Sequence, residues 1–379
     1  MAHPFITLAA ALMLSEPAAA DDLRQIDGQP VSVTQMASKL RLPWGLAFLP
    51  GCEFLVTEKR GRLLRFDLEG HRSRVAGLPK VKTGGQGGLL DIETARDFNT
   101  SRQLFLTYSA AREAGTGTAL AVAELSEDGD RLEKLREVFI SSPVSNGNRH
   151  FGSRVVEAED GNLFLSVGDR GERSTAQYPG SHNGSILRIR RDGTVPDTNP
   201  FTTSPEAKPE IWSIGHRNPQ GMTFDNDGRL WISEHGARGG DEINHVLPGL
   251  NFGWPVISYG VHYSGRKIGE GFSKEGMEQP AHYWDPSIAP SGMIAYSGAL
   301  WPQWEGNLFV GSLKFDLISR LELSDRLRET EQIRIPETKR VRDVQEAPDG
   351  TIWFISEDRG AVYRISPPSG PPGDSGWCH

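Results

Sequence analysis

The sequence predicts an all-β protein whose strands form a six-bladed β-propeller with four-stranded antiparallel blades. Apolar runs of four to six residues alternate with turn signals along the chain, and almost no stretch shows a convincing helical stripe. This is the pattern of an array of short strands. A unit made of an apolar start, a Pro/Asp/Gly turn and an apolar strand also recurs at intervals of about 45 to 75 residues, which is typical of propeller blades around a central channel.

The recurring unit appears six times along the chain. Its apolar segments are residues 44–48, 54–57 and 61–66; 88–92 and 103–108; 153–156, 162–167 and 185–189; 221–224 and 230–233; 291–294, 304–311 and 320–323; 342–344, 352–355 and 362–365. Several units carry an Asp-Gly or Pro-Gly turn, where glycine permits the backbone conformation that tight turns need. A large β-sandwich or two stacked barrels would also use many short strands, and they are the alternatives.

Composition agrees with a single large β domain. The chain has 379 residues, of which 43 are glycine and 25 are proline, and it contains no polar linker that would separate two domains. Its formal net charge of -8 argues against nucleic acid or an anionic membrane as the partner. We therefore expect no nucleic-acid partner and no membrane anchor.

The chain is expected to divide into three segments. Residues 1–20 have an apolar core that is too short to span a bilayer and small residues ending at Ala20, which indicates a secretory signal peptide. A disordered tail is the alternative there. Residues 21–366 would form the propeller, and residues 367–379, rich in Pro, Gly and Ser, a flexible C-terminal tail. The mature protein is thus predicted to be periplasmic or secreted.

Two cysteines, Cys52 and Cys378, are too few for a disulfide framework. In a propeller the first and last blades are neighbours, so the two thiols could meet in an oxidising compartment. Cys378 also lies in the Pro/Gly/Ser-rich tail and could equally be free. The sequence leaves both readings open.

A histidine and an aspartate flank predicted strands of the third unit. His150 comes immediately before that unit, and Asp169 ends a neighbouring strand. Both side chains are expected at the same end of one blade, where a carboxylate can orient an imidazole as a general base. The alternative is a histidine in a surface loop and an aspartate that caps a turn.

Four cations occupy corresponding strand edges in three different units, two of them as a pair in the last unit. They are Arg217, Lys314, Arg340 and Arg342. Each alone would be ordinary surface charge, but cations that converge need an anionic ligand or a transition state that gains negative charge. The sequence therefore predicts that these cations meet either an anionic ligand or a transition state that gains negative charge.

Two further segments have the composition of binding loops. The glycine-rich residues 83–89 would let the backbone approach a flat ligand, with the amide of Gln86 as the specific polar group. Residues 233–244 mix carboxylates with glycine carbonyls, which are the hard oxygen donors that suit calcium, although the spacing is not that of an EF-hand. A tight turn between blades and a plain acidic loop are the alternatives.

Taken in order, these motifs resemble the soluble quinoprotein glucose/sorbosone dehydrogenase family, in particular its aldose sugar dehydrogenase branch. The likeness covers essentially the whole mature chain. It rests on the segments around Gln86, His150, Asp169, 217–221, 240–244, 251–255, Lys314 and 340–343.

The resemblance implies a function and a set of roles. The family uses pyrroloquinoline quinone (PQQ) and calcium to oxidise aldose sugars to lactones. By resemblance His150 would take the proton of the anomeric hydroxyl, Asp169 would orient His150, and Arg217 would stabilise negative charge on the quinone. The residues implied to hold PQQ are Gln86, Arg217, Asn218, Tyr263, Lys314, Arg340 and Arg342.

The resemblance also implies two calcium sites. One would use the backbone carbonyls of Gly236 and Ala237, and the other the Glu242 carboxylate with the Phe252 carbonyl. Ala237 replaces a proline common in relatives, and this change should be tolerated because only the carbonyl is used. Phe315-Asp316 follow Lys314 where close relatives carry a further lysine, which leaves the cofactor affinity on that side open.

Other expectations concern partners and rival functions. The substrate would be an aldose, the electron acceptor is unidentified, and the chain would be a monomer or a homodimer. A calcium-dependent sugar lactonase on a six-bladed propeller is one alternative, but it would have no use for four converging cations. A non-enzymatic binding propeller is the other, and it would be expected to lose His150 or Arg217.

Overall fold

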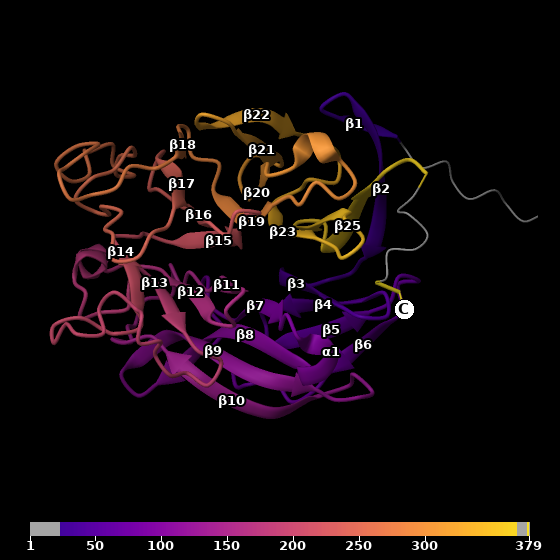
Figure 1. The fold of residues 1–379 in the computed structure, drawn as a ribbon, viewed down its shortest axis with the longest axis horizontal. Coiled ribbons are helices and arrows are strands. Elements are labelled where there is room, and N and C mark those ends of the chain that lie inside the picture. The colour runs from indigo at the N-terminus through magenta and orange to yellow at the C-terminus, as the bar shows by residue number, and fades with distance from the viewer. Residues whose placement is uncertain (1–22, 370–376, 379) are drawn as a thin grey trace, which may run out of the picture.

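The structure, a computed structural model, describes residues 23–369 and 377–378. The predicted signal peptide, residues 1–20, lies outside the described residues. Six β-sheets are arranged around a central axis, and Figure 1 shows them in chain order around the ring. This arrangement confirms the predicted six-bladed β-propeller.

Five blades are built from four consecutive antiparallel strands each. Their strands are β3 (Pro43–Leu49), β4 (Glu53–Glu58), β5 (Arg62–Phe66) and β6 (Arg72–Val75); β7 (Leu89–Thr94), β8 (Gln103–Arg112), β9 (Gly115–Leu125) and β10 (Leu132–Ile140); β11 (Val155–Glu157), β12 (Leu163–Val167), β13 (Ser185–Ile189) and β14 (Ile211–Ile214); β15 (Pro219–Phe224), β16 (Leu230–Glu234), β17 (Asp241–His245) and β18 (His282–Trp284); β19 (Pro290–Ala295), β20 (Leu308–Ser312), β21 (Ile318–Leu323) and β22 (Leu327–Ile333). Helical structure in the described residues is limited to α1 (Phe98–Ser101), η1 (Arg173–Gln177) and η2 (Pro302–Trp304).

The sixth blade joins the two ends of the chain. It contains β23 (Val341–Glu346), β24 (Ile352–Ser356) and β25 (Ala361–Ser366), and its fourth strand is β2 (Gln29–Ala37) from the N-terminal side. β1 (Arg24–Ile26) pairs with β2 as a fifth strand, so this blade departs from the predicted four-stranded form. The pairing of β2 with β25, the last strand, closes the ring.

The inner strand of five blades begins with a register irregularity. The shifts lie between Pro43 and Leu46, Leu89 and Ile92, Pro219 and Gly221, Pro290 and Met293, and Val341 and Asp343. A bulge at such a position bends the strand and re-aims a side chain. All five lie at the same end of the ring, because each inner strand starts beside the end of its blade's second strand.

The core is divided into clusters of buried apolar side chains along the blades and between adjacent ones. Strand residues such as Leu55, Leu165 and Val310 are fully buried, because the faces of neighbouring blades pack against each other. No helix in the described part of the chain is long and apolar enough to cross a membrane.

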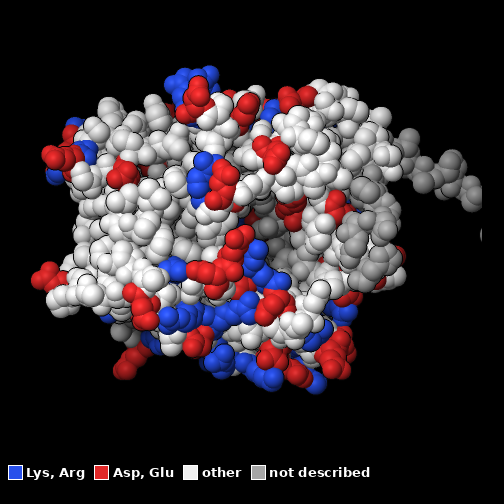
Figure 2. All heavy atoms as spheres, viewed as in Figure 1, with Lys and Arg blue, Asp and Glu red and all other residues white. Residues whose placement is uncertain are grey.

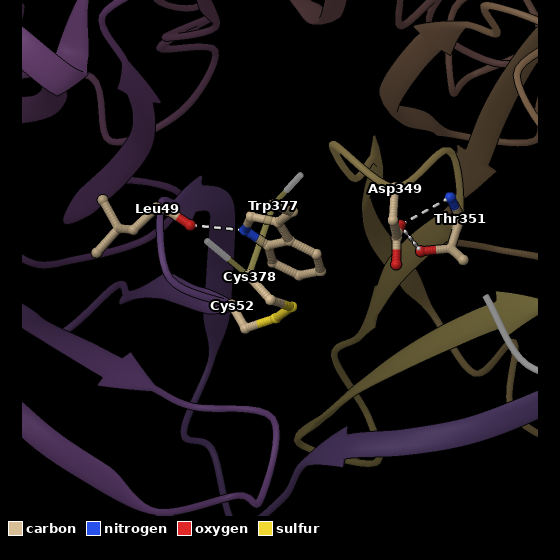
Figure 3. The surroundings of a disulfide bond; sticks show 6 residues. All are labelled: Leu49, Cys52, Asp349, Thr351, Trp377 and Cys378. Carbon is tan, nitrogen blue, oxygen red and sulfur yellow. Dashed lines mark hydrogen bonds between the residues drawn. A yellow bond between two sulfur atoms is a disulfide. The ribbon is translucent and has the colours of Figure 1, made fainter. Parts of the chain in front are cut away.

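A disulfide between Cys52 and Cys378 fastens the C-terminal end to the turn between β3 and β4 (Figure 3). Beside it the indole nitrogen of Trp377 donates a 2.6 Å hydrogen bond to the carbonyl oxygen of Leu49, and Trp377 is 4% exposed. The pairing that the sequence left open is therefore formed. Trp377 and Cys378 are docked, contrary to the expected flexible tail, while residues 370–376 and 379 lie outside the described residues.

Candidate active site

A cavity of about 250 Å³ opens at the mouth of the channel. Its walls come from the places where inner strands begin and second strands end, which is why every blade contributes. The lining residues are Trp44, Lys59, Gly85, Gln86, Leu90, Phe151, Gly152, Asn218, Gln220, His235, Ala289, Leu313, Arg340, Arg342 and Glu357. Figure 2 shows a hollow near the middle of one face, with Lys, Arg, Asp and Glu side chains at its margin.

The irregular starts of the inner strands supply part of this lining. Trp44, Leu90, Gln220 and Arg342 each lie within one of the register shifts and line the cavity. In a regular strand, alternate side chains point to opposite faces. The bulges therefore explain how these four residues, one from each of four blades, line the cavity at the channel mouth.

His150 and Asp169 form the predicted pair. The Nδ1 atom of His150 lies 2.6 Å from Oδ1 of Asp169. Asp169 is 1% exposed, and its Oδ1 and Oδ2 also accept hydrogen bonds from the Gly171 amide and the Trp254 indole, at 2.7 and 2.8 Å. A carboxylate at Nδ1 favours the tautomer that leaves Nε2 as the acceptor. The pair can therefore act as an oriented base.

His150 is held in an unusual backbone conformation beside the cavity. Its φ is 53°, a left-handed value that is uncommon for residues other than glycine. Its backbone amide donates a 2.6 Å hydrogen bond to the side-chain oxygen of Gln86, which lines the cavity. The glycine-rich loop and the histidine loop are thereby joined, as expected for residues of one site.

The protonation of the pair follows from its surroundings. Burial lowers the pKa of His150, and the positive charges of Arg217 and Arg149 lower it further, while Asp169 opposes the change. Burial alone would raise the pKa of Asp169, but the hydrogen bond and charge of His150, the Gly171 amide and Arg217 lower it overall. The imidazole is therefore neutral and the carboxylate ionised near pH 7.

Arg217 and Asn218 lie next to this pair, at the start of β15. The Arg217 guanidinium donates to the carbonyl oxygen of His235 at 3.2 Å, and Arg217 is 7% exposed. Asn218 lines the cavity, and its side-chain oxygen accepts a 3.2 Å hydrogen bond from the Gly152 amide. Both residues are therefore fixed by backbone contacts before any ligand binds.

The cavity carries a surplus of positive charge. Arg340 and Arg342 both bind Glu357, with Nε to carboxylate oxygen distances of 3.1 and 2.8 Å. Lys59 is a third cation in the lining and donates a 2.9 Å hydrogen bond to the Gly85 carbonyl. Burial lowers the pKa of Lys59, and Arg342 and Arg340 lower it further against the effect of Glu357. An anion in this cavity would be stabilised.

Three of the residues implied to hold the cofactor lie outside the lining of this cavity. Arg217 lines a smaller neighbouring cavity instead. Tyr263 is 75% exposed in the long connection between β17 and β18. Lys314 is exposed just after β20, and its Nζ lies 4.6 Å from the ring centroid of Phe315. Their roles toward a cofactor stay predictions.

A second, much smaller cavity of about 10 Å³ adjoins the first. It is lined by Gly236, Glu242 and Phe252, three of the four predicted metal ligands, together with Glu234, His235 and other residues. Ala237 follows Gly236 directly in a short bridge with Gly239. The space is about that of one water molecule, so a single ion would fit.

The carboxylates beside this small cavity are buried and close together. The Asn244 amide nitrogen donates to Glu234 at 3.1 Å and to Glu242 at 3.2 Å, while the Asn244 oxygen is buried without a partner in the described residues. Burial raises the pKa of Glu242 to about 8, and the neighbouring Glu234 adds to this effect. A bound cation would relieve this repulsion between carboxylates.

Six polar or aromatic residues of the cavity lining were not predicted from the sequence as site residues. They are Trp44, Lys59, Phe151, Gln220, His235 and Glu357. Lys59, His235 and Glu357 each come directly after the second strand of a blade, as the neighbourhoods of Asp169 and Lys314 do. Comparing equivalent positions of the six repeats would have found these three.

The chain is similar to known proteins in both sequence and structure. The sequence profile of the glucose/sorbosone dehydrogenase family matches residues 40–364. An aldose sugar dehydrogenase of Escherichia coli is 40% identical over 345 residues, covering 89% of this chain and 93% of the relative. The crystal structure of the soluble, apo-form E. coli aldose sugar dehydrogenase superposes with a TM-score of 0.86 at 39% identity, over 89% of this chain and 99% of that one.

A further solved structure carries a cofactor. The PQQ-bound form of an aldose sugar dehydrogenase from Streptomyces coelicolor matches with a TM-score of 0.71 at 25% identity, over 89% of this chain and 98% of that one. An oriented neutral imidazole beside a cation-lined cavity is suited to enzymatic proton transfer. With the match to the family profile, the chain belongs to the glucose/sorbosone dehydrogenase family and is an oxidoreductase.

Proposed function

We propose that this protein is a quinoprotein dehydrogenase that oxidises aldose sugars at the anomeric carbon to lactones, with PQQ and calcium as cofactors. One observation carries the proposal: the cavity beside the His150–Asp169 pair has three cations in its lining and Glu357 as its single carboxylate. A tricarboxylate such as PQQ would balance that charge. A neutral or cationic cofactor would leave the surplus uncompensated.

The residues present fit such a cofactor. Arg342 and Lys59 would offer charge-assisted hydrogen bonds to its carboxylates, with Arg340, Asn218 and Gln86 beside them. Lys314, Tyr263 and Arg217 complete the set implied by the family. When bound, PQQ would supply the carbonyl carbon that accepts a hydride.

The chain's own residues would perform the proton chemistry. His150 would take the hydroxyl proton of the sugar at Nε2, because Asp169 occupies Nδ1. The Asp169 carboxylate would stabilise the imidazolium that results. Arg217 would stabilise negative charge that grows on an oxygen of the cofactor, which is the role of a preorganised cation.

Calcium would be held at two places. The backbone carbonyls of Gly236 and Ala237 would help to hold the ion that contacts PQQ. A second ion would use the Glu242 carboxylate and the Phe252 carbonyl, in the small cavity that both residues line. The raised pKa of Glu242 fits a site where a divalent cation replaces a proton.

The setting would be outside the cytoplasm. The predicted signal peptide, residues 1–20, and the Cys52–Cys378 disulfide both support a periplasmic or secreted protein. Residues 21–366 would be the catalytic propeller. The expected partners are an aldose and an electron acceptor of unidentified nature, and the expected oligomeric state is a monomer or a homodimer.

Reconstitution tests the proposal. Protein purified without PQQ should reduce a dye with an aldose once PQQ and calcium are both added, and neither cofactor should suffice alone. Hydrolysis of a sugar lactone by the metal-loaded protein, without dye reduction, would favour the lactonase alternative. Failure of both assays in protein that binds PQQ with its usual fold would favour a non-enzymatic propeller.

A further inference from the structure

A groove wider than both cavities lies beside the 250 Å³ cavity, which is called the cofactor cavity below because we propose that it holds PQQ. The volume of the groove is about 610 Å³, and it is lined by Leu42, Lys59, Arg60, Thr83, Gly84, Gly85 and Gly87. Two of these residues, Lys59 and Gly85, also line the cavity described above. The hydrogen bond from Lys59 to the Gly85 carbonyl, at 2.9 Å, therefore lies on the boundary between the two spaces.

The groove is positively charged. Its lining contains two cations and no carboxylate. Arg60 is exposed and has no ion pair among the described residues, and Lys59 contacts a backbone carbonyl instead of an acid. Arg340 and Arg342 also lie near Lys59 and help to lower its pKa, and the single negative charge of Glu357 offsets only part of their positive potential at this boundary.

We propose that this groove is a binding site for a small anionic electron acceptor. The proposal rests on the proposed function, because an acceptor needs a reduced cofactor in the neighbouring cavity. An anion beside Lys59 and Arg60 would lie next to that cavity, separated from it by one side chain and one turn. The open shape suits a ligand that must exchange rapidly.

The redox balance of the step is simple. Oxidation of one aldose to its lactone releases two electrons and two protons. With ferricyanide as the anionic acceptor, two ferricyanide ions would each take one electron and become ferrocyanide, and two protons would go to water. No further reactant is needed.

Arg60 is the informative position for a test, because it lines the groove and not the cofactor cavity. Holoenzyme loaded with PQQ and calcium is assayed with saturating glucose and either ferricyanide or the cationic acceptor phenazine methosulfate. Arg60→Gln should raise the KM for ferricyanide about three- to tenfold at low ionic strength, and Arg60→Glu should raise it more. The limiting rate should stay unchanged.

Matched controls separate a site from general surface charge. Arg72 is an exposed arginine on β6, the outer strand of the same blade, so Arg72→Gln removes the same charge elsewhere and should leave both KM values unchanged. The KM for phenazine methosulfate should not rise in any variant. The effect at Arg60 should shrink as salt screens the interaction.

A binding measurement gives a readout without turnover. Hexacyanocobaltate(III) has the shape and charge of ferricyanide but does not accept electrons, so it should compete with ferricyanide and bind holoenzyme in calorimetry. Arg60→Glu should weaken that binding. Equal binding by the native protein and the Arg60→Glu variant would overturn the proposal, as would an unchanged KM for ferricyanide.

A separate measurement distinguishes failure of this proposal from failure of the proposed function. Adding glucose without any acceptor should change the absorption spectrum of bound PQQ, and this tests the sugar half-reaction alone. If Arg60→Gln raises the KM for glucuronate but not the KM for ferricyanide, the groove serves an acidic sugar and the acceptor assignment is wrong.

Discussion

The Nδ1 atom of His150 lies 2.6 Å from the Oδ1 atom of Asp169, although the two residues belong to different loops of the third blade. The same carboxylate is fixed by Gly171 and Trp254. Both oxygens of the Asp169 carboxylate are therefore held in place by hydrogen bonds from other parts of the chain. The imidazole is left with one free nitrogen, so its chemical role is decided before the substrate arrives.

Asp169→Asn should reduce kcat by about two to four orders of magnitude, because an amide can hold the ring but cannot stabilise the imidazolium or fix the tautomer. PQQ binding should remain near native. Steady-state rates and a titration of apoprotein with PQQ measure the two effects. A variant that keeps native turnover would remove Asp169 from the mechanism.

His150→Ala should lower turnover by a similar factor of about 10² to 10⁴ while PQQ stays bound, as loss of a general base usually does. The folded protein should remain intact, which circular dichroism checks. Near-native turnover in this variant would show that another group takes the proton.

The pH dependence follows from the direction of the His150 shift. Its pKa lies below the ordinary value of 6.5, so the neutral base is present above this lowered pKa and is lost as pH falls through it. The acid limb of kcat/KM should thus lie below pH 6.5. Arg149→Gln removes a charge that lowers this pKa, and it should move the limb to higher pH. No movement, or movement to lower pH, contradicts the assignment.

Arg342→Ala should weaken PQQ binding by about 1.5 to 3 kcal/mol, since a charge-assisted hydrogen bond to a carboxylate would be lost. Lys314→Ala was expected from the sequence to do the same, and the exposed position of Lys314 makes it the informative comparison. Titration of each apoprotein with PQQ measures the dissociation constants. An unchanged dissociation constant in either variant shows that the side chain concerned does not contact PQQ.

The fold could be predicted from the sequence because the same pattern of strands and turns recurs six times along the chain. Each repeat carries its own strands and turns, so errors at single boundaries do not change the count. The fifth strand, β1, was not predicted, since residues 24–26 form one short strand on an edge. The disulfide could not be decided, because the position of Cys378 depends on how Trp377 docks.

The site was less accessible to sequence reasoning. His150 and Asp169 could be paired because both flank the short strands of one blade. The contributions of Trp44 and Gln220 depend on the irregular starts of β3 and β15, which regular alternation does not reveal. Lys59 was missed because its segment was interpreted only as a strand and turn, although the repeat places it beside Arg342.

Removing the disulfide should destabilise the protein. Cys52→Ser should lower the free energy of unfolding by about 2 to 4 kcal/mol, because the link closes a loop of 326 residues in the unfolded chain. Denaturant unfolding of the variant and of native protein under reducing conditions should give the same loss. If the variant, the reduced native protein and the oxidised native protein are equally stable, burial of Trp377 alone holds the C-terminal end.

Calcium removal should abolish activity, because the backbone carbonyls of Gly236 and Ala237 would complete an ion shell that PQQ fills only in part. Chelation of the holoenzyme should stop aldose oxidation, and calcium with PQQ should restore it. Magnesium should substitute poorly, since it demands a more regular shell. Glu242→Gln should weaken binding of the second calcium ion, so that calcium addition raises the melting temperature of this variant less than that of the native protein. Native rates in enzyme shown by elemental analysis to be calcium-free would refute the metal assignment.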